Sequence, residues 1–146
     1  MAFAEGVGGE RYNLRTGNTV PKKASAAYLA SGTPPAKWHL VKESTTANDE
    51  VEHCVAGDVP YGYIFSVTGG INMVTVLEWR NNYLFAEYNG AAPGYGPSTV
   101  VADGSAGTIP IGGFLRDRVK AGAGSALTEV VNKDEYATGV VGIRNR

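Results

Sequence analysis

His53 and Cys54 are adjacent in the sequence, and they are the residue types that form a thiolate nucleophile and its general base. Such a pair needs its two side chains within hydrogen-bonding distance, whereas neighbouring residues of a β-strand point to opposite faces. The other histidine of the chain, His39, lies in a different predicted strand. We therefore expect Cys54 to be a small buried hydrophobic residue and not a nucleophile.

The other polar residues give weaker patterns for chemistry. The two histidines and one cysteine lack the C-x-x-C or H-E-x-x-H spacing of metal sites. Asp58 is expected to bond its own backbone in a turn. Glu78 and Glu87 could face each other across a predicted hairpin, as paired carboxylates do in hydrolases, but cross-strand partners of this kind are more often surface residues. We expect no enzyme, and no catalytic, cofactor-binding or metal-binding residues.

Length and charge narrow the class of protein. The 146 residues fit one domain. The 13 basic and 14 acidic residues give a formal charge of -1, which argues against a nucleic-acid partner, since such binders carry a basic face. The single cysteine excludes an intrachain disulfide. No window approaches the ~20 apolar residues that cross a bilayer, and the N-terminus lacks a signal-peptide pattern, so we expect no membrane partner and synthesis in the cytoplasm.

Glycine and proline occur throughout the chain, at 20 and 7 residues, and leave little room for helices. Between them lie short runs rich in β-branched and aromatic residues. The predicted strands cover residues 38–43, 50–55, 61–68, 73–77, 83–86, 99–103, 107–111, 126–131 and 138–144. Asn81-Asn82 predicts a hairpin turn, with one helix over 72–89 as the competing interpretation, and Asp103-Gly104 predicts another turn. The expected fold is all-β, a small single-domain β-barrel or β-sandwich.

Residues 1–24 differ from the rest because they are polar and glycine-rich and contain few core-forming side chains. Two interpretations stay open: a disordered tail, or an extended arm that orders on a neighbouring subunit. The folded domain is then expected to cover 25–146. Aromatic and cationic side chains of the arm and of the loop after Asn89 are the expected interface residues. These candidates are Arg11, Tyr12, Arg15, Lys22, Lys23 and Tyr95.

Two glycine-containing motifs occur in order along the chain. Gly57-Asp58-Val59-Pro60-Tyr61-Gly62 follows the first pair of predicted strands, and Ala102-Asp103-Gly104 follows the central strands. Over roughly residues 36–143 the order of these turns and short strands resembles that of the small capsid decoration (cement, or head-stabilising) proteins of tailed bacteriophages. The chain departs from that family at the Asn81-Asn82 turn, where a glycine is expected, and in a longer loop at 91–98.

The resemblance implies a β-tulip-like barrel domain, commonly a homotrimer, on the outer surface of an icosahedral phage capsid. It implies binding to the major capsid protein after the shell expands, bridging of neighbouring subunits, and neither catalytic residues nor contact with DNA. The expected function is therefore a structural virion protein that stabilises the capsid. The alternative is a small β-sandwich that binds a carbohydrate or other ligand on a phage tail or cell surface. Its stacking platform would contain Tyr63, Trp79, Tyr83 and Tyr95.

Overall fold

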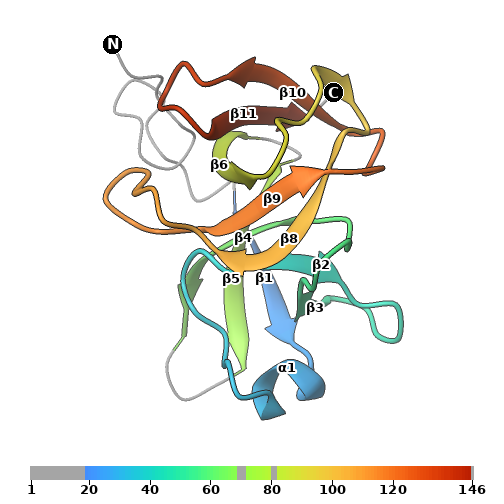
Figure 1. Ribbon diagram of the computed structural model, residues 1–146. Coiled ribbons are helices and arrows are strands. Elements are labelled where there is room, and N and C mark those ends of the chain that lie inside the picture. Colours follow the sequence, from blue (N-terminus) through green and yellow to red (C-terminus); the bar gives the residue numbers. More distant parts are fainter. Residues whose placement is uncertain (1–18, 69–71, 80–81, 146) are drawn as a thin grey trace.

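The computed structural model describes residues 19–68, 72–79 and 82–145. Within these ranges the chain folds into two curved sheets and one short helix, which confirms the expected small all-β domain (Figure 1). The barrel strands occupy the lower half of that view and β10 and β11 the upper half, with β8 and β9 between them. No helix in the described part of the chain is long and apolar enough to cross a membrane.

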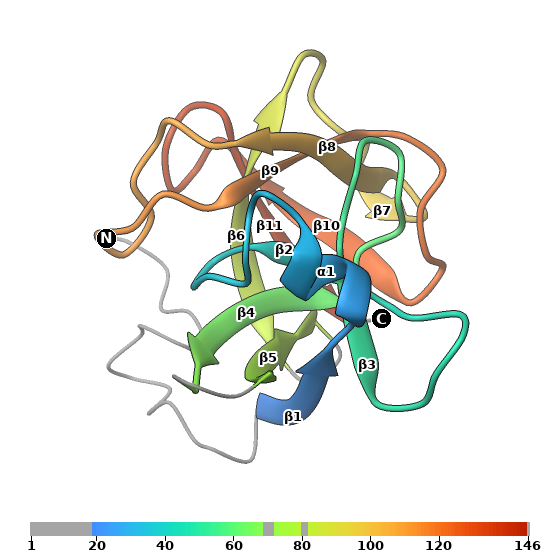
Figure 2. The ribbon, with the colours of Figure 1, turned by 90° about the horizontal axis from the view of Figure 1, so that it is seen from below.

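Five strands close into a barrel in the order β1-β3-β2-β4-β5. Their bounds are Thr19–Ala24 (β1), Leu40–Glu43 (β2), Glu50–His53 (β3), Gly62–Val67 (β4) and Met73–Glu78 (β5). The short helix α1, Ala26–Ala30, follows β1 directly, and Figure 2 shows it from below. Inward-facing side chains such as Val41, Val51 and Ile64 are fully buried, and each such burial stabilises the fold by roughly 1.5–3 kcal/mol.

The second half of the chain forms a six-stranded sheet in the order β7-β10-β11-β6-β9-β8. Its strands are Tyr83–Asn89 (β6), Gly96–Pro97 (β7), Val100–Ala106 (β8), Asp117–Ala121 (β9), Thr128–Lys133 (β10) and Val140–Asn145 (β11). The edge strands are therefore β7, which is very short, and β8.

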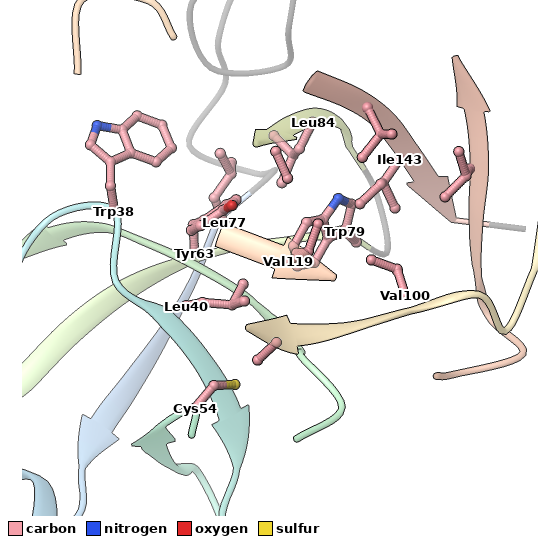
Figure 3. Close-up of a cluster of buried hydrophobic side chains, with 14 residues drawn as sticks. Trp38, Leu40, Cys54, Tyr63, Leu77, Trp79, Leu84, Val100, Val119 and Ile143 are labelled. Carbon is pink, nitrogen blue, oxygen red and sulfur yellow. The ribbon is translucent and has the colours of Figure 1, made fainter. Parts of the chain in front are cut away.

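One hydrophobic core joins the two sheets. Trp38, Leu77 and Trp79 from the barrel half pack in the same cluster as Leu84 and Ile143 from the six-stranded sheet (Figure 3). The barrel also has an interior cluster of its own, which contains Val41, Val51 and Ile64, but the shared cluster joins the two sheets into one packed unit.

The predicted hairpin around Asn81-Asn82 is wrong, and so is the competing helix. Strands β5 and β6 flank this segment as expected, but β5 pairs within the barrel and β6 pairs with β11 and β9 in the other sheet. Asn81 lies outside the described residues, and Asn82 donates its side-chain amide to the carbonyl of Glu78 at 2.7 Å. The chain therefore crosses between sheets where sequence periodicity alone predicts a return to the same one.

Three other boundaries also differ from the prediction. Asp103-Gly104 is an irregularity inside the single strand β8, where the register with β9 shifts between Ala102 and Ala106. The strand expected from Trp38 begins at Leu40, since Trp38 has a φ of 70° and breaks the extended conformation. The arm predicted over 1–24 extends too far, because Thr19–Ala24 is a barrel strand that pairs with β5 and β3. Residues 1–18 lie outside the described part of the chain.

Candidate functional site

The Gly57-Asp58 turn connects the barrel half to the second sheet. The Gly57 N–H donates to the Ala102 carbonyl at 2.9 Å, and the Ala102 N–H donates to the Asp58 carbonyl at 2.8 Å. Gly57 has a φ of 91°, in the left-handed region that a turn glycine supplies at little cost. Because β8 is an edge strand, these bonds occupy main-chain groups that an edge otherwise leaves open for another chain.

Gly104 allows the two sequence motifs to meet. Its φ is 85°, and a Cβ placed there would lie 2.7 Å from the Ala56 nitrogen and 3.1 Å from the Ala56 Cα. In the 55–58 turn, Asp58 Oδ2 accepts from the Val55 N–H at 2.8 Å, which confirms the predicted turn role of this carboxylate. The same oxygen lies 3.1 Å from Lys42 Nζ. The Gly-Asp-Val-Pro and Ala-Asp-Gly motifs, distant in sequence, therefore form one contact between the sheets.

Cys54 and His53 are separated as the strand geometry predicts. Cys54 is buried in the shared core (Figure 3), and burial raises the pKa of its thiol, as does the nearby Asp58 carboxylate. His53 instead lies 2.7 Å through Nε2 from Asp117 Oδ2. The prediction that Cys54 is a small buried hydrophobic residue is confirmed.

His53 meets the other histidine of the chain. The His39 and His53 rings stack with their centroids 4.2 Å apart and their planes 9° apart. Tyr28, from α1, stacks on His53 at 5.3 Å, and its hydroxyl oxygen lies 2.6 Å from His39 Nδ1. Burial raises the pKa of the Tyr28 phenol, as does the charge of Asp117, so the phenol keeps its proton while it is hydrogen-bonded to His39 Nδ1.

Asp117, the first residue of β9, links this cluster to the second sheet. Besides accepting from His53, its Oδ2 accepts from the Leu40 N–H at 2.9 Å. Its carbonyl accepts from the Tyr63 hydroxyl at 2.7 Å, and its N–H donates to the Trp38 carbonyl at 3.1 Å. Several segments of the barrel half thus converge on one residue of the other sheet, and the bonds to the carboxylate are of the stronger, charge-assisted kind.

A histidine hydrogen-bonded to a carboxylate also serves as a general base in enzymes. Here the nearby groups that could act as nucleophiles do not fit that role, because Cys54 is buried in the core as a thiol and the Tyr28 phenol keeps its proton and is hydrogen-bonded to His39. The described ranges also contain no group of three or more His, Cys, Asp or Glu side chains placed to hold a metal ion. The cluster is arranged as a polar connection between α1, the barrel and β9.

Sequence reasoning missed this cluster because it treated the two histidines as unrelated. Strands β2 and β3 pair with Val41 opposite His53, which places His39 diagonally across the ladder, within reach of a ring side chain. Assigning a register to the two predicted strands would have found the pair. No local signal indicates Asp117, which is 64 residues from His53 in the sequence.

An apolar groove of about 380 Å³ lies on another part of the surface. Its most exposed apolar side chains are Val59, at 45% exposure, and Leu127, at 64%, and the rings of Tyr61 and Trp79 also line it. The remaining lining residues are Lys42, Glu43, Pro60, Ser125 and Thr128. Exposed apolar side chains that gather around a groove are typical of contact surfaces between proteins.

The predicted interface residues differ in how far they are exposed to solvent. Arg11, Tyr12 and Arg15 lie outside the described residues. Lys22 is 8% exposed, with Nζ 3.7 Å from Glu43 Oε2, 3.6 Å from Asp49 Oδ1 and above the Tyr61 ring, so little of it is open to a partner. Lys23 is exposed on β1. Tyr95 is 61% exposed, and Lys133 Nζ lies 4.3 Å from its ring centroid.

The residues named for other functions do not come together. Glu78 and Glu87 belong to different sheets, and Glu87 accepts from the main-chain N–H groups of Thr108 and Ile109 at 2.6 and 2.8 Å. Tyr63 and Trp79, expected in a sugar-stacking platform, are buried in the shared core together. Neither a carboxylate pair nor an exposed aromatic platform forms from these side chains.

Comparison with known proteins gives no further lead. No family model matches the chain, and no curated protein or solved structure matches it. The assignment of a function therefore rests on the residues and contacts described above.

Proposed function

We propose that this protein is a structural virion protein that decorates the outer surface of a bacteriophage capsid and stabilises it by bridging major capsid protein subunits. The observation that carries the proposal is the contact between the Gly57-Asp58 turn and β8 at Ala102–Gly104. These are the two motifs on which the resemblance to decoration proteins rests. Their meeting at one inter-sheet junction supports reading them as parts of a shared scaffold and not as unrelated turns.

The groove supplies a surface suited to such binding. Val59 belongs to the same turn motif, and with Leu127 it presents exposed apolar side chains beside the groove. Burying one such side chain against a capsid subunit contributes roughly 1.5–3 kcal/mol at most. A contact that is weak for one subunit becomes strong when a homotrimer engages several subunits of a symmetric shell at once. Residues 1–18, with Arg11, Tyr12 and Arg15, are proposed as an additional contact arm.

The chemistry of the described residues is consistent with a structural role. Asp117 and the two histidines connect elements of the fold to one another. Glu87 likewise binds main-chain groups of its own chain. We propose that the protein acts without catalysis, bound to the capsid of a virus assembled in the host cytoplasm.

The proposal is tested by adding the purified protein to expanded, undecorated capsids and counting bound copies at micromolar concentration. We expect saturable binding, with Leu127→Asp and Val59→Asp each weakening it by more than about tenfold, which is roughly 1.4 kcal/mol. Val67→Asp is the matched control. Val67 is also an exposed valine, but it lies at the C-terminal end of β4, whereas Val59 precedes the N-terminal end, and it does not line the groove. Absence of binding by the wild-type protein would refute the proposal, and binding to a glycan in its place would favour the alternative function.

A further inference from the structure

We propose that the stacked His39–His53 pair is an acid-sensitive clamp between the barrel and the six-stranded sheet, closed at neutral pH and loosened in mild acid. The clamp consists of Tyr28, His39, His53 and Asp117, which come from α1, the segment before β2, β3 and β9 respectively. The inference stands on these contacts and does not depend on capsid binding.

The geometry of the clamp favours two neutral rings, or a single charge, over two charges. Two imidazolium rings with their centroids 4.2 Å apart would repel each other at a distance well inside the Debye length of ~8 Å in physiological salt. A charge on both rings therefore opposes the closed arrangement.

Among the residues that the structure describes, few other titratable groups surround the two rings. Tyr28 faces them from α1 and Asp117 from β9, and Cys54 follows His53 in the chain. Beyond these, Lys42 pairs with Asp58 at 3.1 Å and with Glu52 at 3.9 Å. Of the acidic groups named here, Asp117 is hydrogen-bonded to the pair, and it contacts only the His53 ring.

The direction of the pH dependence follows from His39. Burial lowers the pKa of His39, and the neighbouring His53 lowers it further, while Asp117 acts in the opposite sense. The unfolded chain, with an ordinary histidine pKa of about 6.5, then binds protons more readily than the folded chain. Above a pH of about 6.5 the titration of His39 costs the fold no stability. As the pH falls from there toward the lower pKa of His39 in the folded chain, the free energy of unfolding decreases.

The chain offers a clean test, because its only two histidines are both in the clamp. We would measure the unfolding equilibrium by urea denaturation between pH 7.5 and pH 5 for wild type, His39→Asn, His53→Gln and the double variant. Asn at 39 keeps an acceptor near the Nδ1 position, and Gln at 53 keeps a donor near the Nε2 position. We expect the wild-type unfolding constant to rise by up to tenfold per pH unit below pH 6.5, as one extra proton binds on unfolding, and the double variant to lose that rise.

A second measurement follows the opening itself and requires only the wild-type protein. Cys54 is buried beside His53, and its labelling by 4,4′-dithiodipyridine reports access to the junction. Thiol reactions slow in acid, so the labelling rate of Cys54 is divided at each pH by the rate of glutathione in the same buffer, and a higher ratio at pH 5.5 than at pH 7.5 would support opening of the clamp. An unchanged or lower ratio, or a flat unfolding constant over the same range, would overturn the proposal. An equal rise in the unfolding constant of the double variant would also overturn it, because another group would then be responsible.

Discussion

Replacing Gly104 by alanine tests whether the junction between the two motifs depends on a close backbone approach. Two costs are expected. A φ of 85° places an L-residue in the left-handed region at about 1–2 kcal/mol, and a Cβ 2.7 Å from the Ala56 main-chain nitrogen forces a backbone shift of about 1–3 kcal/mol. A gain of about 0.4–1 kcal/mol from the less flexible unfolded chain offsets part of this loss.

Gly90→Ala is the matched control for this substitution. Gly90 has a φ of 75°, but a Cβ there would have no neighbour within 4 Å, so only the cost of the backbone conformation applies. Gly57, with a φ of 91° and the same open surroundings, belongs to the turn itself and is expected to behave like Gly90. The difference between Gly104→Ala and Gly90→Ala therefore isolates the contact with the 55–58 turn.

Urea denaturation, with the free energy of unfolding extrapolated to water, measures this difference. We expect Gly104→Ala to lose about 1–3 kcal/mol more than Gly90→Ala, a large fraction of the roughly 5–15 kcal/mol that stabilises a typical domain. Equal losses in the two variants would refute the reasoning, because the turn would then be free to move away from β8.

Two further predictions concern buried polar atoms. Cys54→Ser should lower the free energy of unfolding by about 1–3 kcal/mol, because it buries a hydroxyl in an apolar cluster, and should leave capsid binding unchanged; lost binding at normal thermal stability would show that the thiol has a function. Glu87→Ala should lower it by about 2–5 kcal/mol, since the N–H groups of Thr108 and Ile109 each lose their acceptor. Urea denaturation measures the effect, and a loss below about 1 kcal/mol would mean that water replaces the carboxylate.

Much of the fold could be predicted from local sequence. The strands at 50–55, 61–68 and 138–144 lie within two residues of β3, β4 and β11. The turn expected at Asp58 is also formed, with a φ of 91° at Gly57 and a hydrogen bond from the Val55 N–H to the Asp58 carboxylate. These features depend on the few residues around them, so a single sequence is sufficient to indicate them.

The pairing of strands could not be predicted in the same way. Met73–Glu78 and Tyr83–Asn89 have the composition of a hairpin, yet they enter different sheets because Leu77, Trp79 and Leu84 are buried in the core shared by both. Strand composition describes how one segment fits a pleated surface and does not identify its partner. The choice of partner depends on burial across the whole domain.

The sequence by itself determined the all-β class, the turn at Asp58 and the buried state of Cys54, because these follow from conformational preference and from the alternation of side chains along a strand. Only the tertiary structure brought the Gly-Asp turn onto β8 and joined His39, His53 and Asp117. The reason is physical: hydrogen bonds and ring contacts act over a few ångströms, and residues far apart in the chain reach that distance only after the two sheets have packed on their common core.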